Sequence, residues 1–151
     1  MRIPTDLEIL NTIYRLYHST FVAFERGDGT RDSKIYVPID CKKIASELKV
    51  DADIVFGRLY YHLEKQYGYK QSDGSNVDFF ALKVGNDPKC VNFPLMTSVL
   101  ASLRQERKKF WIGTAIAILA LIISAVSLTV SITQQGSSNK SVQPTAEAAA
   151  D

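Results

Sequence analysis

The chain has 151 residues, with 18 basic and 16 acidic side chains and two cysteines. Residues 1–103 carry 13 basic and 13 acidic side chains, so this part has no net charge. About a hundred residues suffice for one small hydrophobic core and leave no room for a second domain. The charge balance also excludes a strongly basic nucleic-acid-binding domain.

The first predicted element is a helix that begins after Pro4. Thr5 can cap it, and Glu8, three residues later, completes a capping box. Apolar side chains then recur at helical spacing from Leu10 to Phe24. The following sequence, ERGDGTRDS, is rich in glycine and aspartate and is therefore expected to form a loop.

A short β-prone run, KIYVP at 34–38, precedes two further helices. Asp40 is expected to cap the second helix, and Asp51 or Asp53 the third, which runs through IVFGRLYYHLEKQ. The turn between these helices is brief, as in a helix-turn-helix. Four side chains of the third helix are expected to face inward: Val55, Leu59, His62 and Leu63.

Residues 67–93 alternate as strands do. The turn DGSN contains Asp73 and Gly74, a strong hairpin signal, and a second turn is expected at Asn86, Asp87 and Pro88. The predicted order is therefore helix, strand, helix, helix and β-hairpin.

The stretch IASELKVDADIVFGRL resembles the core of a winged helix-turn-helix domain, and the resemblance covers residues 5–93. Ala45, Leu48 and Val50 surround the turn, while Lys49 stands where glycine is often found. The resemblance implies an α+β fold with a β-hairpin wing, and binding of duplex DNA by the third helix in the major groove.

The outer face of the third helix is poorly suited to binding DNA. At 100° per residue it presents two carboxylates and two tyrosines, whereas bases and phosphates favour Arg, Lys, Asn and Gln. The tyrosines either pack partly against the first helix or the wing, or are exposed as a protein-binding patch. The predicted recognition face consists of Asp53, Gly57, Tyr60, Tyr61 and Glu64. Phosphate contacts, if DNA is bound, would come from Lys42, Lys43, Lys49, Arg58, Lys65 and Lys70.

An enzyme is not expected, because the sequence has no phosphate-binding glycine loop, nucleophile elbow or metal-ligand spacing. We therefore predict no catalytic residue, metal or cofactor. Cys41 and Cys90 are expected to be reduced and buried. His18 and His62 are expected to be structural.

Residues 110–132 are 23 consecutive residues without a charge, and as a helix they would extend about 34 Å, enough to cross a membrane. A basic helix at 94–109, begun by Pro94, is expected before this span, and a disordered tail at 133–151 after it. The positive-inside rule then places the N-terminal domain in the cytosol, and a bacterial inner membrane is the favoured location. The flank of the span consists of Arg104, Arg107, Lys108, Lys109 and Trp111.

Small side chains within the span recur at spacings of 4, 3, 4, 3 and 4 residues. This pattern predicts a seam at which two membrane helices approach closely, so a homo-oligomer is expected. The seam comprises Gly113, Ala117, Ala120, Ser124, Ser127 and Ser131, and the same spacing extends back through Val99 and Met96.

The sequence thus predicts a single-pass membrane protein with a cytosolic winged helix domain. Its expected function is regulatory or scaffolding, through an unidentified cytosolic protein partner. The alternative is a membrane-tethered, DNA-binding transcriptional regulator.

Overall fold

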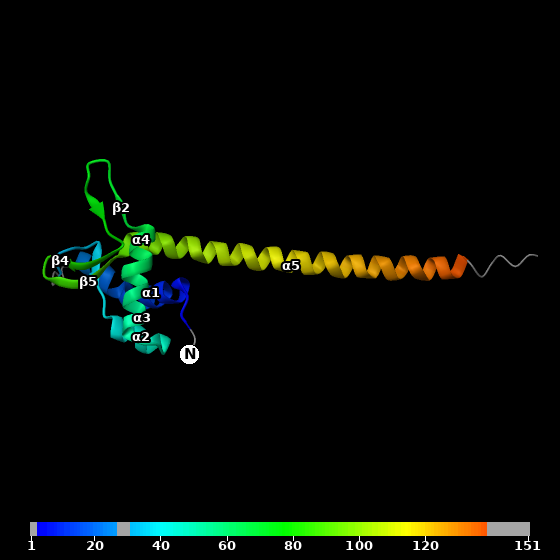
Figure 1. Ribbon diagram of the computed structural model, residues 1–151, viewed down its shortest axis with the longest axis horizontal. Coiled ribbons are helices and arrows are strands. Elements are labelled where there is room, and N and C mark those ends of the chain that lie inside the picture. Colours follow the sequence, from blue (N-terminus) through cyan, green and yellow to red (C-terminus); the bar gives the residue numbers. More distant parts are fainter. Residues whose placement is uncertain (1–2, 27–30, 139–151) are drawn as a thin grey trace, which may run out of the picture. The chain divides into compact units, whose positions relative to one another are not determined.

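The computed structural model describes residues 3–26 and 31–138 (Figure 1). The chain combines helices and sheets with one long apolar C-terminal helix, which confirms the coarse part of the predicted fold class. It divides into two compact units, Met1–Glu106 and Arg107–Asp151.

Helix α1 spans Asp6–Ala23 and begins with the predicted capping box. The Thr5 hydroxyl accepts the Glu8 N–H at 3.3 Å, and the Glu8 carboxylate accepts the Thr5 N–H at 2.9 Å. Its inward face buries Ile9, Leu10 and Ile13 completely. A short 3₁₀ helix, η1 (Phe24–Arg26), follows it.

Helix α2 (Cys41–Leu48) is capped by Asp40, and helix α3 (Ala52–Gly57) by Asp51 rather than Asp53. Between them Lys49 adopts the left-handed conformation, with φ 56° and ψ 46°. Glycine is favoured at this position, just after a helix, because a Cβ strains the left-handed backbone. Lys49 therefore adopts the backbone conformation that glycine favours in this turn, at some cost in stability.

The third predicted helix is continuous but not uniform. After α3 the chain makes a π-helical segment, η2 (Arg58–Leu63), and then a short α-helix, α4 (Glu64–Tyr67). Val55, Leu59 and Leu63 are fully buried, as predicted. His62 was wrongly expected to face inward: its side chain is 47% exposed, because the wider π turn does not keep the assumed 100° per residue.

The strands form two small antiparallel sheets. β1 (Tyr36–Pro38), β5 (Asp87–Asn92) and β4 (Phe80–Val84) form one sheet in that order, and β2 (Tyr69–Lys70) pairs with β3 (Asn76–Val77) in the other. In Figure 1 the β2–β3 hairpin projects beyond the other strands of the first unit.

The second turn, expected over GNDP at 85–88, is shorter in the structure and comprises only Gly85 and Asn86. Gly85 adopts a positive φ of 57°, and β5 already begins at Asp87, so Pro88 is in the strand. A Cβ on Gly85 would lie 2.1 Å from a carboxylate oxygen of Asp32, so this turn also needs glycine for space.

Helix α5 spans Phe93–Ser138, and Pro94 occupies its first turn as predicted. Met96, Val99 and Leu100 are buried in the core of the first unit. The first unit thus includes the helix as far as Glu106, and the helix expected at 94–109 runs on without a break into the apolar stretch. Apolar periodicity alone could not distinguish a helix packed on its own domain from one that leaves it.

The strain at Lys49 generates a stability prediction. Lys49→Gly should raise the free energy of unfolding by about 1 kcal/mol, because it removes the left-handed strain of a residue with a Cβ. Chemical unfolding of the full chain in detergent, followed by far-UV circular dichroism, measures this change.

Lys42→Gly is the matched control, since Lys42 is an exposed lysine within α2. It should lower stability by about 1 kcal/mol, the ordinary penalty for glycine in a helix. A destabilised Lys49→Gly variant would contradict the argument from strain.

Candidate functional site

The predicted recognition face is not one uniform exposed surface. Asp53 and Tyr61 are exposed, and the Tyr61 side chain is exposed to 71%. Gly57, Tyr60 and Glu64 are only partly exposed. The π turn of η2 lies within this face and changes the direction of the residues that follow it.

The two tyrosines have different environments. Tyr60 stacks on Phe56 with ring centroids 5.5 Å apart, and Phe56 in turn meets Phe80 of β4 edge-on at 5.9 Å. Tyr61 contacts the Tyr60 ring edge-on at 5.0 Å and extends outward. Of the two alternatives, partial packing therefore applies to Tyr60 and exposure to Tyr61.

Glu64 binds the sheet instead of presenting a free carboxylate on an outer face. Its Oε2 accepts the backbone N–H of Phe80 at 2.6 Å. Gly68 makes room for this arrangement, because a Cβ there would lie 2.4 Å from Glu64 Oε1. Glu64 therefore links the end of the third helix to β4, a contact for which the sequence carried no signal.

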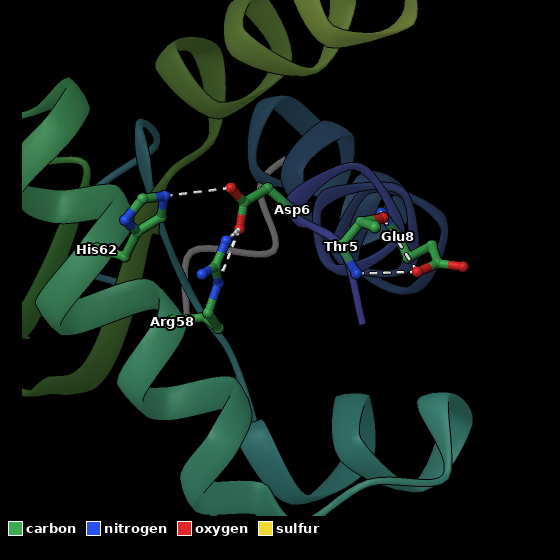
Figure 2. A network of polar contacts seen from close by, with 5 residues as sticks. All are labelled: Thr5, Asp6, Glu8, Arg58 and His62. Atoms are coloured by element: carbon green, nitrogen blue, oxygen red, sulfur yellow. Dashed lines mark hydrogen bonds and ion pairs between the residues drawn. The ribbon is translucent and has the colours of Figure 1, made fainter. Parts of the chain in front are cut away.

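A second polar cluster attaches the third helix to α1 (Figure 2). The Asp6 carboxylate accepts hydrogen bonds from Arg58 Nε at 3.0 Å and Nη2 at 2.5 Å. His62 Nε2 lies 3.3 Å from the other Asp6 oxygen. Figure 2 shows Asp6 between the two side chains from the third helix. Arg58 is thus held by an internal partner at the place where a phosphate contact was expected.

The other five basic side chains predicted to contact phosphate are exposed. They lie on α2, in the turn after it, on α4 and on β2, and the set is Lys42, Lys43, Lys49, Lys65 and Lys70. Lys43 Nζ lies 5.8 Å from the centre of the Tyr17 ring, so its ammonium group faces an aromatic ring of α1. The structure thus places basic charge around the third helix, while the face itself carries Asp53 and Tyr61.

Two hollows adjoin Glu64. One, with a volume of about 410 Å³, lies along β4. The other, of about 320 Å³, lies toward the β2–β3 hairpin. Glu64 and Asp78 line both, so the region where they meet is acidic. The first is lined by Tyr60, Glu64, Asp78, Phe80, Ala81, Leu82 and Lys83.

Both cysteines are free and buried, as predicted. Burial raises the pKa of the Cys41 thiol. Burial and the nearby Asp87 carboxylate raise the pKa of Cys90 to about 11. Because the thiolate is the reactive form, neither thiol is suited to nucleophilic chemistry at neutral pH. Among the described residues, no group of three or more His, Cys, Asp or Glu side chains could hold a metal ion.

The later part of α5 meets the size and polarity requirements of a membrane span. Within Phe93–Leu128, an apolar stretch of 18 residues has a mean hydropathy of 2.3, and none of it is buried. Trp111, at its start, is also exposed. Helix α5 continues to Ser138, so residues 133–138 of the tail expected at 133–151 are helical, and the rest of that tail lies outside the described residues.

The basic residues of the flank lie in two different environments. Arg104 donates to Asn11 Oδ1 from Nε at 3.1 Å and lies 5.9 Å above the Tyr14 ring, so it belongs to the first unit. Arg107, Lys108 and Lys109 are exposed.

The predicted seam of small residues is exposed at Gly113, Ala117, Ala120, Ser124 and Ser127. Both of these serines donate their hydroxyls to α5 itself, Ser124 to the Ala120 carbonyl at 2.9 Å and Ser127 to the Ile123 carbonyl at 3.0 Å. The side chain of Ser131 lies outside the described residues. Met96 and Val99 cannot extend the seam, because both are buried in the first unit.

Comparison with protein-family models, curated proteins and solved structures finds no match to this chain.

The Asp6 cluster generates a prediction about stability. Asp6→Ala should destabilise the protein by about 1–2 kcal/mol, because it leaves the half-buried Arg58 without its carboxylate partner. Chemical unfolding of the full chain in detergent measures the loss.

Glu47→Ala provides the matched control, since it breaks the ion pair between the more exposed side chains of Arg15 and Glu47. The expected loss there is at most about 0.5 kcal/mol. Equal losses in the two variants would show that Asp6 does not anchor the third helix.

Proposed function

We propose that this chain is a membrane-anchored, non-enzymatic protein-interaction module of the winged helix type, with a regulatory or scaffolding function. The apolar part of α5 supports the anchor, because a helix that is apolar on every side and exposed throughout suits lipid rather than water. Arg107, Lys108 and Lys109 precede this part, which supports a cytosolic first unit.

The order of elements supports the winged helix assignment. A helix, a short strand, two helices joined by a brief turn and then a hairpin follow one another, and β1 pairs with the last strand of that hairpin. The short β2–β3 hairpin is an additional element between the third helix and β4.

The observation that carries the proposed interaction function is the exposure of Tyr61 on the third helix. A tyrosine exposed to 71% beside another aromatic ring offers a large contact area at small loss of side-chain entropy, and tyrosine is enriched at protein interfaces. The Asp53 carboxylate, which is exposed on the same helix, favours a partner with basic side chains over a nucleic acid.

A comparison of two tyrosine substitutions tests this function. Tyr61→Ser should reduce the recovery of co-purifying protein about tenfold or more, because an exposed aromatic anchor can contribute 2 kcal/mol or more to binding. The measurement is quantitative mass spectrometry of proteins cross-linked to the full chain in intact membranes.

Tyr69→Ser is the control, since Tyr69 is also an exposed tyrosine but lies on β2. It should leave recovery unchanged. The proposed role of Tyr61 would fail if both variants retained the same cross-linked proteins as the unmodified chain.

DNA binding is the second candidate function, and the observation in its favour is the group of five exposed lysines around the third helix. Phosphate contacts make affinity fall steeply with salt. We expect the full chain in nanodiscs to bind labelled mixed-sequence duplex only weakly, because Arg58 is paired internally and Asp53 is exposed on the third helix.

Fluorescence anisotropy measured between about 50 and 200 mM salt distinguishes DNA binding from the proposed protein interaction. Tight binding that weakens steeply over this range, and that Lys42→Ala with Lys43→Ala reduces, would favour a membrane-tethered regulator instead.

A further inference from the structure

The starting observation concerns three consecutive basic residues at the start of the second unit, Arg107, Lys108 and Lys109. All three side chains are exposed, and none of them forms an ion pair with a residue that the structure describes. The other cation of the flank, Arg104, is held by contacts within the first unit. The cations available to a partner at this point of α5 are therefore the three at 107–109.

These cations spread around the helix instead of gathering on one face. Successive residues of an α-helix differ by about 100° in direction, so residues 107–109 span about 200° of the circumference. Their long stems extend the reach of each charged group. Glu106, just before them, is exposed, and three cations against this one carboxylate leave a net charge of +2. The arrangement suits several small anionic partners around the helix better than one flat surface.

The apolar stretch that follows sets the depth of the three cations in a membrane. Phe110 and Trp111 begin this stretch, and both rings are exposed. An indole ring prefers the layer of the lipid headgroups. At 1.5 Å per residue, Arg107 lies about 6 Å along the helix axis from Trp111, and Lys109 about 3 Å. The three charged groups therefore lie at the level of the lipid phosphates.

The other end of the stretch carries no matching charge. No Lys, Arg, Asp or Glu occurs from Phe110 to Asn139, and Lys140 is the next charged residue. The attraction to lipid phosphates thus acts in one leaflet, which is the cytosolic leaflet in the proposed topology. This step rests on the proposed membrane anchor.

The chemistry of the basic side chains selects the kind of lipid. Arginine can bind a phosphate through two parallel N–H donors, and lysine binds it as a point charge. In a zwitterionic lipid the headgroup cation compensates the phosphate, whereas in an anionic phospholipid the negative charge remains. Each basic residue near an anionic bilayer surface strengthens the attraction about fivefold. Three such residues therefore favour anionic over zwitterionic lipids.

We infer that Arg107, Lys108 and Lys109 bind the phosphate groups of anionic phospholipids, which gather around α5 in the cytosolic leaflet. The chemistry recognised is that of a phosphate. The bilayer supplies it rather than the solution, because the apolar stretch holds the cations at the level of the headgroups. This binding is separate from the proposed contact made by Tyr61, which lies in the first unit.

Fluorescence quenching tests the inference, because Trp111 is the only tryptophan in the sequence. It follows Arg107 by four residues and so lies on the same side of α5. The full chain is reconstituted into vesicles of phosphatidylglycerol, which is anionic, and phosphatidylcholine, which is zwitterionic, in equal parts. One set of vesicles contains the first lipid brominated near its headgroup, and the other set contains the second lipid brominated in the same way.

Bromine quenches tryptophan fluorescence only at short range, so randomly distributed lipids would quench equally in the two sets. We expect brominated phosphatidylglycerol to quench Trp111 about twofold more strongly than brominated phosphatidylcholine, because the adjacent cations attract the anionic lipid. Both leaflets have the same composition, so the result does not depend on the orientation of the chain.

A triple substitution identifies the groups responsible. Arg107→Gln, Lys108→Gln and Lys109→Gln together should make the two brominated lipids quench equally, while glutamine preserves the helix propensity. The matched control instead replaces three exposed lysines of the first unit and changes the net charge equally: Lys65→Gln, Lys70→Gln and Lys83→Gln. The control should keep the preference. A preference that survives the first variant, or that both variants lose equally, would overturn the inference.

The remaining outcomes separate the lipid preference from the anchor on which it rests. Equal quenching in the unmodified chain would leave the anchor standing and overturn the lipid preference. No quenching by either lipid would show that Trp111 is not in the bilayer, and would overturn both. Inorganic phosphate and chloride at equal ionic strength should weaken the preference equally, because both only screen the charges. A larger effect of phosphate would show a site for soluble phosphate and contradict the assignment to lipid.

Discussion

The π-helical turn over Arg58–Leu63 determines where the functional side chains of the third helix point. A π turn is wider than an α turn, so the residues that follow it are rotated relative to a regular helix. The rotation lets Leu59 and Leu63 remain in the core while His62 reaches the Asp6 carboxylate and Glu64 reaches the backbone of β4. The helix is thus tied to α1 on one side and to the sheet on the other.

These two attachments explain why the charged groups of the helix are not all available to a partner. Arg58 is neutralised by Asp6, and Glu64 accepts the Phe80 N–H. A half-buried charge needs such a partner, because burial without one is costly. The groups left for recognition are the Tyr61 ring, the Asp53 carboxylate and the exposed lysines of neighbouring elements. This selection supports the proposed protein partner rather than DNA.

Helix α5 combines two environments in one continuous element. Its first turns bury Met96, Val99 and Leu100 in the core of the first unit, and its later turns expose apolar side chains over the whole circumference. In the proposed membrane-anchored protein, confinement to one bilayer would raise the local concentration of the first unit, which favours weak contacts between copies. The exposed small residues of α5 are a feature that such contacts could use.

Local sequence signals were sufficient to predict the features that depend only on residues close together along the chain. The Thr5–Glu8 capping box, the Asp40 cap and the inward positions of Leu59 and Leu63 followed from spacing alone. The apolar stretch after residue 110 was equally clear, because length and lack of charge are properties of composition.

Only the tertiary structure could decide how distant segments share space. The π turn, the pairing of Asp6 with Arg58 and the bond from Glu64 to Phe80 join residues that no periodicity relates. The start of α5 is a further example. The spacing of its apolar residues is equally compatible with burial in a core and with a seam between two helices, and only the structure shows that they are buried. The sequence by itself thus determined the elements, their caps and the candidate span, since these depend on local hydrogen bonds and composition. The packing of the helices and strands decided which side chains remain free to bind, because burial and pairing depend on contacts between segments far apart in the chain.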